Sequence, residues 1–94
     1  MQRNSHLPRV EIVYCTRCRF LLRAAWIAQE LLATFAERLG EVALVPGAGG
    51  VLEVRLGDET LYSRKTMGEV DPTALKRAVR DRVAPDMRIG HEEP

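Results

Sequence analysis

The sequence contains no apolar run that approaches the ~20 residues needed for a membrane-spanning helix. Its first residues, 1–8, also lack the apolar core of a secretory signal peptide. Cysteine is scarce, with two in 94 residues, whereas a small secreted scaffold needs more of them spread along the chain. Neither sign of charge dominates, because 14 Lys and Arg residues balance 13 Asp and Glu residues. We therefore expect a cytoplasmic protein with no membrane partner and no nucleic-acid partner.

The composition is that of an ordinary globular domain. Hydrophobic residues make up 46% and charged residues 29% of the chain, which argues against disorder. A chain of 94 residues can bury one core but not two. Polar, aperiodic sequence predicts flexible tails at 1–8 and 86–94, with a single domain at 9–85 between them.

Hydrophobic periodicity predicts four strands and two helices. Alternating or β-branched residues indicate strands at 9–14, 41–45, 51–56 and 60–64. Apolar residues at three- and four-residue steps indicate a long helix over 15–39. A second helix is expected to start at Asp71-Pro72, where Asp suits the N-cap and Pro the first helical position, and to end before Pro85.

The element order β-α-β-β-β-α predicts an α/β fold (an α+β sandwich) of the thioredoxin-like type, with a four-stranded mixed sheet. A strand–helix–strand unit normally has parallel strands, and the hairpin that follows adds antiparallel ones. Both helices should cover one sheet face, which leaves Val13 and Val51 on the other face among Glu11, Glu53 and Arg55. That open face suits a homo-oligomer or a protein partner, and an ordinary solvated surface is the alternative.

A Cys-x-x-Cys motif, Cys15-Thr16-Arg17-Cys18, lies where the first predicted strand meets the first predicted helix. Cysteines three positions apart on a helical turn bring their sulfurs close enough to form a disulfide. The unpaired N–H groups of a helix N-terminus and the charges of Arg17 and Arg19 would favour a thiolate, which is the attacking species, although the two arginines could equally form only a solvated helix start. The motif therefore predicts thiol–disulfide exchange, in which one cysteine attacks an oxidised partner and the other resolves the mixed disulfide.

The chain resembles the selenoprotein W-like (Rdx) family, as a cysteine-containing bacterial-type member, over about residues 9–84. The segments that carry the resemblance are Val10–Cys18, Gly49–Val54 and Leu61–Lys65. The resemblance implies a thioredoxin-like fold and a redox role that is often regarded as glutathione-linked. It suggests Cys18 as the reactive residue, because animal relatives carry selenocysteine at that place. Thioredoxin reasoning instead makes the first, more exposed cysteine the attacker, so a coupled pair with Cys15 slightly favoured is our expectation.

A glycine-rich breaker over 46–50 separates the second and third predicted strands. Thioredoxins place a cis-proline just before the third strand, but here Gly49-Gly50 occupies that place and Pro46 stands too early. Two glycines let a backbone or a peptide approach closely, although they could equally form only a turn. The candidate site contains no metal ligand; it combines Cys15 and Cys18 with the docking or pKa-tuning residues Thr16, Arg17, Arg19, Gly49 and Gly50.

Three functions from different classes fit these residues. The first is a thiol–disulfide oxidoreductase without a cofactor of its own, with protein or low-molecular-weight thiols and disulfides as partners and a thiol such as glutathione as reductant. The second is a binding adaptor whose Cys15–Cys18 pair switches partner affinity without turnover. The third, a zinc module, is disfavoured because zinc takes four ligands, and only the terminal His6 and His91 remain to complete the set. Inert buried thiols are the last alternative.

Overall fold

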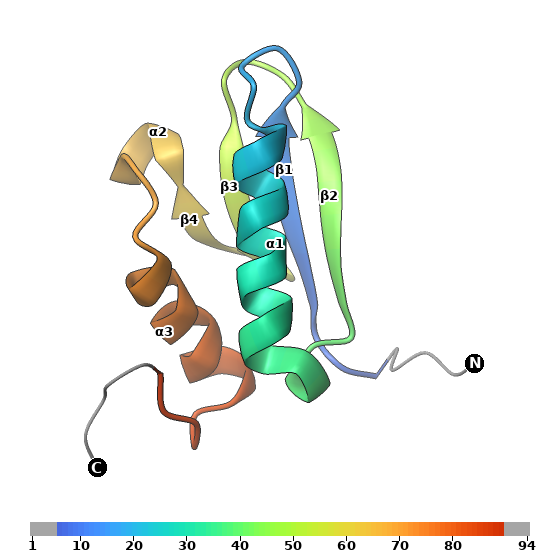
Figure 1. Ribbon diagram of the computed structural model, residues 1–94, viewed down its shortest axis with the longest axis vertical. Coiled ribbons are helices and arrows are strands. Elements are labelled where there is room, and N and C mark those ends of the chain that lie inside the picture. The colour runs from blue at the N-terminus through green and yellow to red at the C-terminus, as the bar shows by residue number, and fades with distance from the viewer. Residues whose placement is uncertain (1–5, 90–94) are drawn as a thin grey trace.

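The computed structural model describes residues 6–89 and shows one four-stranded sheet with helices packed against it (Figure 1). The elements follow the predicted strand and main-helix order, with two short helices added. They are β1 (Arg9–Cys15), α1 (Leu21–Phe35), η1 (Ala36–Arg38), β2 (Glu41–Gly47), β3 (Leu52–Leu56), β4 (Glu59–Ser63), α2 (Arg64–Met67) and α3 (Pro72–Val83). The parts of the predicted tails at 1–5 and 90–94 lie outside the described residues.

The sheet is mixed, as predicted, with the strand order β2-β1-β3-β4. Strand β1 pairs in parallel with β2 and antiparallel with β3, and β3 pairs antiparallel with β4. A bulge between Val54 and Arg55 shifts the β3–β4 register. Because a bulge adds one residue on one strand, the consecutive residues Leu61 and Tyr62 can both be buried on the same side. The element order and the four-stranded mixed sheet agree with the predicted thioredoxin-like fold class, which is confirmed.

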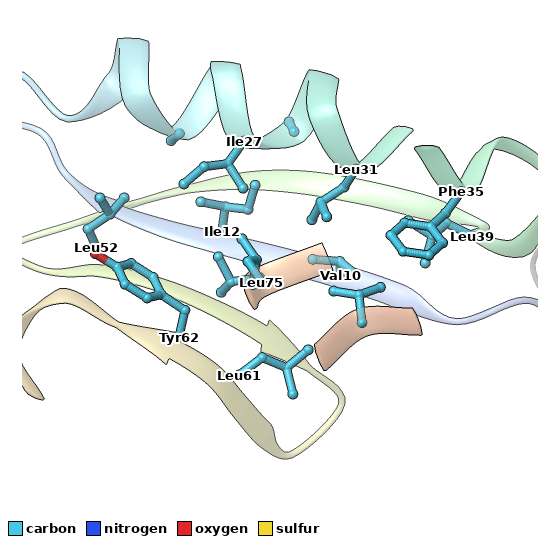
Figure 2. Packing of buried hydrophobic residues seen from close by; sticks show 14 of the residues in the cluster. Val10, Ile12, Ile27, Leu31, Phe35, Leu39, Leu52, Leu61, Tyr62 and Leu75 are labelled. Atoms are coloured by element: carbon cyan, nitrogen blue, oxygen red, sulfur yellow. The ribbon is translucent and has the colours of Figure 1, made fainter. Parts of the chain in front are cut away.

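The core lies between one face of the sheet and the helices α1 and α3. Alternate residues of β1, Val10 and Ile12, point into it and are completely buried. Ile27, Leu31 and Phe35 of α1 pack over them from the helix side (Figure 2). Each fully buried side chain of this size contributes about 1.5–3 kcal/mol through the hydrophobic effect. This packing fixes α1 over β1 and thereby sets the position of the turn that joins the two elements.

Helix α1 begins six residues later than the sequence predicts. Cys15 is still a sheet residue, because it lies opposite Gly47 in the β1–β2 register. Residues 16–19 form a turn, in which Arg19 takes a left-handed backbone conformation with φ of +58°. A left-handed residue cannot continue a right-handed helix, so the helical pattern starts only at Leu21. The prediction that Cys15 and Cys18 share a helical turn was wrong.

Three smaller features also refine the predicted elements. Pro46 and Gly47 belong to β2 rather than to the breaker, which is allowed because β2 is an edge strand and tolerates the missing N–H of proline. The one-turn helix α2 was not predicted. Asp71 caps α3 as predicted, accepting hydrogen bonds from the backbone N–H groups of Thr73 and Ala74 at 3.0 and 3.2 Å.

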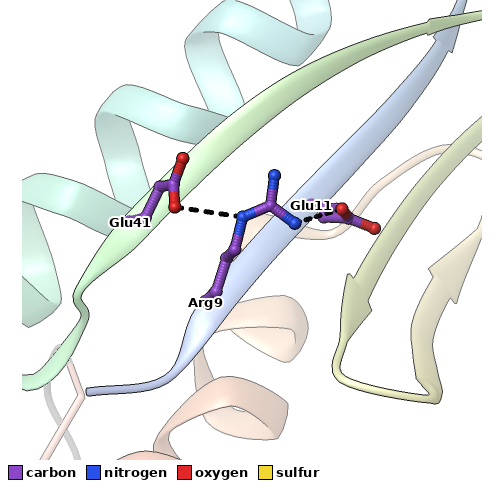
Figure 3. A network of polar contacts seen from close by, with 3 residues as sticks. All are labelled: Arg9, Glu11 and Glu41. Atoms are coloured by element: carbon purple, nitrogen blue, oxygen red, sulfur yellow. Dashed lines mark hydrogen bonds and ion pairs between the residues drawn. The ribbon is translucent and has the colours of Figure 1, made fainter. Parts of the chain in front are cut away.

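The open sheet face, opposite α1 and α3, carries mixed side chains. Val13 and Val51 are half-buried there. At the start of β1, Arg9 joins Glu11 and Glu41 in a charged network on this surface (Figure 3). Among the described residues, no helix is long and apolar enough to cross a membrane.

Candidate functional site

The candidate site lies at the end of the sheet where β1 and β2 finish and α1 begins (Figure 1). The backbone N–H of Cys15, the last residue of β1, donates to the carbonyl of Val51 at 2.7 Å. The N–H of Thr16 donates to the carbonyl of Gly47 at 3.2 Å. These bonds hold the Cys15–Cys18 turn against the 48–51 loop, so the predicted approach of the two segments is present in the structure.

The two cysteine sulfurs lie 2.7 Å apart, with the thiol of Cys18 donating to the sulfur of Cys15. Both cysteines are free thiols. Cys15 is only 3% exposed, whereas Cys18 is exposed. The expectation that the first cysteine is the more accessible one is therefore reversed. The reason is that Cys15 remains within the sheet, while Cys18 lies on the turn that leaves it.

The environment lowers the pKa of Cys15 and raises that of Cys18. Cys15 is favoured as a thiolate first by the hydrogen bond from Cys18, and next by the backbone N–H of Gly50, while burial opposes the charge. The pKa of Cys18 rises chiefly because its proton is held in the hydrogen bond to Cys15, and partial desolvation of its sulfur at that contact adds to this effect. The two thiols therefore titrate as an interacting pair rather than independently.

After the Cys18 thiol, it is loop amides rather than a helix N-terminus that favour the Cys15 thiolate. The backbone N–H groups of Arg17 and Cys18 assist that of Gly50 in lowering the pKa of Cys15. Helix α1 starts at Leu21, beyond the motif. The predicted contribution of the helix dipole is therefore replaced by N–H groups of the turn and of the facing loop, which act through the same preference of N–H groups for an anion.

Gly49 and Gly50 form the facing loop with backbone conformations that favour glycine. Their φ angles are +74° and +77°, in a region that residues with a Cβ atom rarely adopt. A Cβ atom built on either residue would meet only Lys65 within 4 Å, at 3.9 Å from Gly49 and 4.0 Å from Gly50. The two glycines thus let the Gly50 backbone reach the sulfurs and leave the space above the loop open.

The predicted tuning residues Thr16, Arg17 and Arg19 are exposed on the turn. Arg17 acts on Cys15 through its backbone N–H. The pKa of Cys18 is raised overall, chiefly by its hydrogen bond to Cys15, and the side-chain charge that offsets part of this rise belongs to Arg64 at the start of α2.

Sequence reasoning did not assign Arg64 or Lys65 to the site, and it considered Phe20 near the cysteines chiefly as a core residue. The Arg64 guanidinium lies 5.2 Å from the centre of the Phe20 ring, within the range of a cation–π contact. The β3–β4 hairpin was predicted, and an antiparallel hairpin returns the chain from the end of β4 to the beginning of β3. That rule places residue 64 near residue 52, next to the glycine loop, and could have found these cations.

No group of three or more His, Cys, Asp or Glu side chains within residues 6–89 is arranged to hold a metal ion. His6 is exposed, and His91 lies outside the described residues.

Comparison with known proteins places this geometry in a family. A model of the Rdx family matches residues 9–81. The crystal structure of a protein from Bordetella parapertussis is 53% identical to this chain, with a TM-score of 0.77, and covers 81% of this chain and 98% of that one. A selenoprotein W-related protein from Vibrio cholerae is 40% identical, with a TM-score of 0.78 over 82% of this chain and 98% of that one. No curated protein matched the chain. On the family match and these identities, the chain belongs to the Rdx family of selenoprotein W-related proteins.

Proposed function

We propose that this protein is a thiol–disulfide redox protein that cycles between a Cys15, Cys18 dithiol and a Cys15–Cys18 disulfide. Membership of the Rdx family indicates a redox-related role. The observation that carries the finer proposal is the 2.7 Å contact between the sulfurs, one buried and one exposed. An S–S bond of about 2.05 Å requires little movement from that position.

In the proposed cycle Cys18 meets the substrate and Cys15 resolves the intermediate. The Cys18 thiolate attacks one sulfur of a substrate disulfide, forms a mixed disulfide and releases the other substrate sulfur as a thiolate. The Cys15 thiolate then attacks Cys18, forms the intramolecular disulfide and releases the second substrate sulfur. The protein dithiol loses two electrons and two protons, which convert the substrate disulfide into two thiols. An external thiol returns the protein to the dithiol by the reverse exchange.

Accessibility and pKa favour different cysteines in the attacking role. The lowered pKa of Cys15 marks it as the place where the shared negative charge rests. Cys15 is 3% exposed, so a substrate sulfur could reach it only after the end of β1 opened. We give accessibility the greater weight, because a proton can move across the 2.7 Å contact more readily than a strand can open. Once Cys18 is bonded to substrate, its thiol no longer donates to Cys15, but the backbone N–H groups of Gly50, Arg17 and Cys18 still favour the Cys15 thiolate for the resolving step.

Trapping of mixed disulfides tests this assignment. Cys15→Ser should accumulate a stable adduct with a disulfide substrate through Cys18, whereas Cys18→Ser should react slowly. Mass spectrometry of the adducts and stopped-flow rates would measure both. The opposite pattern would reverse the roles, and failure of the wild type to form the Cys15–Cys18 disulfide would overturn the redox proposal.

The reductant and the location follow as further parts of the proposal. A low-molecular-weight thiol such as glutathione in the cytoplasm would regenerate the dithiol, and protein thiols or disulfides would be the partners. The open sheet face around Val13 and Val51 is the surface through which a homo-oligomer would form.

An adaptor that uses the same pair as a switch is the second candidate. It is favoured by Leu22, which lies four residues after Cys18, is 82% exposed and suits a protein contact. Turnover of a disulfide substrate with a reductant present supports the catalyst, whereas reversible oxidation without turnover supports the adaptor.

A further inference from the structure

The surface around Cys18 carries unpaired positive charge. Arg17 and Arg19 flank Cys18 on the turn and are exposed. The side chain of Lys65 lies beside the Gly49–Gly50 loop, whose backbone reaches both sulfurs. Within residues 6–89, none of the side chains of Arg17, Arg19 and Lys65 forms an ion pair.

Two further cations near the site share a single carboxylate. Arg23 and Arg64 pair with Glu69 at 3.2 and 3.8 Å. Glu53 of β3 is the acidic residue of the open sheet face that lies nearest to this end of the sheet. It is paired with Val13 in the β1–β3 register. The carboxylates of this end are thus outnumbered by its cations, although the whole chain has a net charge of only +1. Such a local excess attracts anions and accelerates their encounter with the surface.

Exposed leucines lie beside these cations. Leu22 is 82% exposed and Leu21 is 49% exposed in the first turn of α1, directly after the Cys15–Cys18 turn. These two adjacent exposed leucines form a small apolar surface beside the reactive group, and such a surface suits contact with another protein. Small molecules more often bind in concave pockets, whereas Cys18 lies on an exposed turn.

We propose, on the basis of the redox function above, that the oxidised substrate is a protein segment whose disulfide-bonded cysteine is flanked by Asp or Glu residues and by an apolar residue. The carboxylates would lie against Arg17, Arg19 and Lys65, and the apolar side chain against Leu22. The exchange itself is unchanged: Cys18 forms the bond to the substrate sulfur, the partner sulfur leaves, and Cys15 displaces the substrate cysteine as a thiol. A small anionic disulfide would use the cations but not the leucine.

Peptides that differ only in charge test the proposal. Each carries one cysteine as a 2-thiopyridyl disulfide next to leucine, with Glu, Gln or Lys at the same flanking positions. Release of 2-thiopyridone gives the rate constant of attack by the full-length reduced protein. The acidic peptide should react about tenfold to a hundredfold faster than the basic one at low ionic strength. This ratio should shrink in ~1 M salt, where the screening length is only about 3 Å.

Variants identify the side chains that cause the preference. The triple variant Arg17→Gln, Arg19→Gln, Lys65→Gln should bring the acidic peptide to the rate of the neutral one. Arg88→Gln removes a single positive charge from an exposed position beyond α3, away from Cys18, and should leave all the rates unchanged. Leu22→Ser should slow the leucine-containing peptides about threefold to tenfold and leave a leucine-free acidic peptide unaffected.

Several results would overturn the inference, and one of them would also overturn the proposed redox function. Equal rates for the three peptides, or an Arg88→Gln effect as large as that of the triple variant, would reject the acidic substrate. The same preference for the small dicarboxylate dithiodiglycolate over a neutral disulfide, with no effect of Leu22→Ser, would assign the site to small molecules instead. If the wild-type protein reacted with none of the peptides, the proposed redox function itself would fail.

Discussion

The two ends of strand β1 differ in how their charges are used. At its beginning, which we call the charged end, Arg9 pairs with Glu11 and Glu41 (Figure 3). Near the β3–β4 turn, Arg82 of α3 likewise pairs with Glu59 at 2.5 Å. At its finish, which we call the thiol end, Arg17, Arg19 and Lys65 lack ion-pair partners among residues 6–89. Arg9 and Arg82 are thus paired within the molecule, whereas these three cations at the thiol end are not.

The backbone differs between the two ends as well. At the charged end, Gly57 takes a left-handed conformation in a tight turn, and no atom lies within 4 Å of a Cβ placed there. At the thiol end, Gly50 takes a similar conformation, but its N–H reaches two sulfurs. The same local geometry therefore closes a hairpin in one place and supports an anion in the other. This contrast can be tested by substitutions at matched positions.

The largest loss of stability should come from a substitution in the hydrophobic core between the two ends. Phe35→Ala removes a side chain that is 1% exposed and should lower the free energy of unfolding by about 3–5 kcal/mol. Leu22→Ala, at an exposed position of the same helix, should change it by no more than about 0.5 kcal/mol. Urea denaturation measures both. A comparable loss in the two variants would mean that the exposed leucine is packed in solution.

A matched pair of glycine substitutions should separate backbone strain from thiol chemistry. Gly50→Ala and Gly57→Ala each place a Cβ in a left-handed conformation and should each cost about 1–2 kcal/mol of stability. Gly50→Ala should also raise the pKa of Cys15, because displacement of the Gly50 N–H weakens a hydrogen bond to the thiolate. The pH dependence of thiolate ultraviolet absorbance in the Cys18→Ser background measures this pKa without requiring access to the buried sulfur. A pKa change in Gly57→Ala, or none in Gly50→Ala, would contradict the role of the loop amide.

The charge of Arg64 should have a smaller effect, confined to the thiol end. Arg64→Gln removes the cation that lowers the pKa of Cys18, so that pKa should rise and Cys18 should react more slowly near neutral pH. Arg64→Lys should restore much of the rate, because it keeps the charge. Alkylation rates against pH in the Cys15→Ser background measure the effect. If Arg64→Gln and Arg64→Lys behave alike, packing against Phe20 rather than charge explains the role of Arg64.

The smallest effect should be a change in stability at low pH when an ion pair of the charged end is removed. Arg82 lowers the pKa of Glu59 below its ordinary value of 4.5 through their hydrogen bond. A carboxyl with a lowered folded-state pKa stabilises the fold above its unfolded-state pKa, and that contribution is lost as pH falls through the folded-state value. Arg82→Gln should therefore show a smaller loss of stability between pH 6 and pH 3 than the wild type, by urea denaturation. An unchanged loss would show that solvent screens this exposed pair completely.

Local sequence patterns predicted most of the fold. Strand alternation placed Val10 and Ile12 in the core, and Asp71-Pro72 marked the beginning of α3. The Cys-x-x-Cys spacing and the Gly49-Gly50 pair indicated the two segments that meet at the thiol end. These features depend on neighbours in the sequence, or on pairing rules between consecutive strands, so they can be deduced without the structure.

The beginning of α1 could not be predicted in this way. Apolar residues at helical steps follow the motif closely, so the predicted helix was extended back to Cys15. Nothing local shows that Arg19 takes a left-handed conformation with φ of +58°. The hydrogen bond from Cys15 to Val51 keeps the chain in the sheet, and that bond joins segments far apart in the sequence. The exposure of the two sulfurs was mispredicted for the same reason.

The sequence by itself determined that this protein carries a pair of cysteines after the first strand of a thioredoxin-like domain, because spacing and periodicity are local properties. Tertiary structure alone decided that Cys15 is buried while Cys18 is exposed. It also brought the Gly50 N–H to the sulfurs and Arg64 close enough to act on Cys18. Burial, hydrogen bonds and electrostatic interactions depend on distances through space, which are fixed only when β1, the glycine loop and the end of β4 come together.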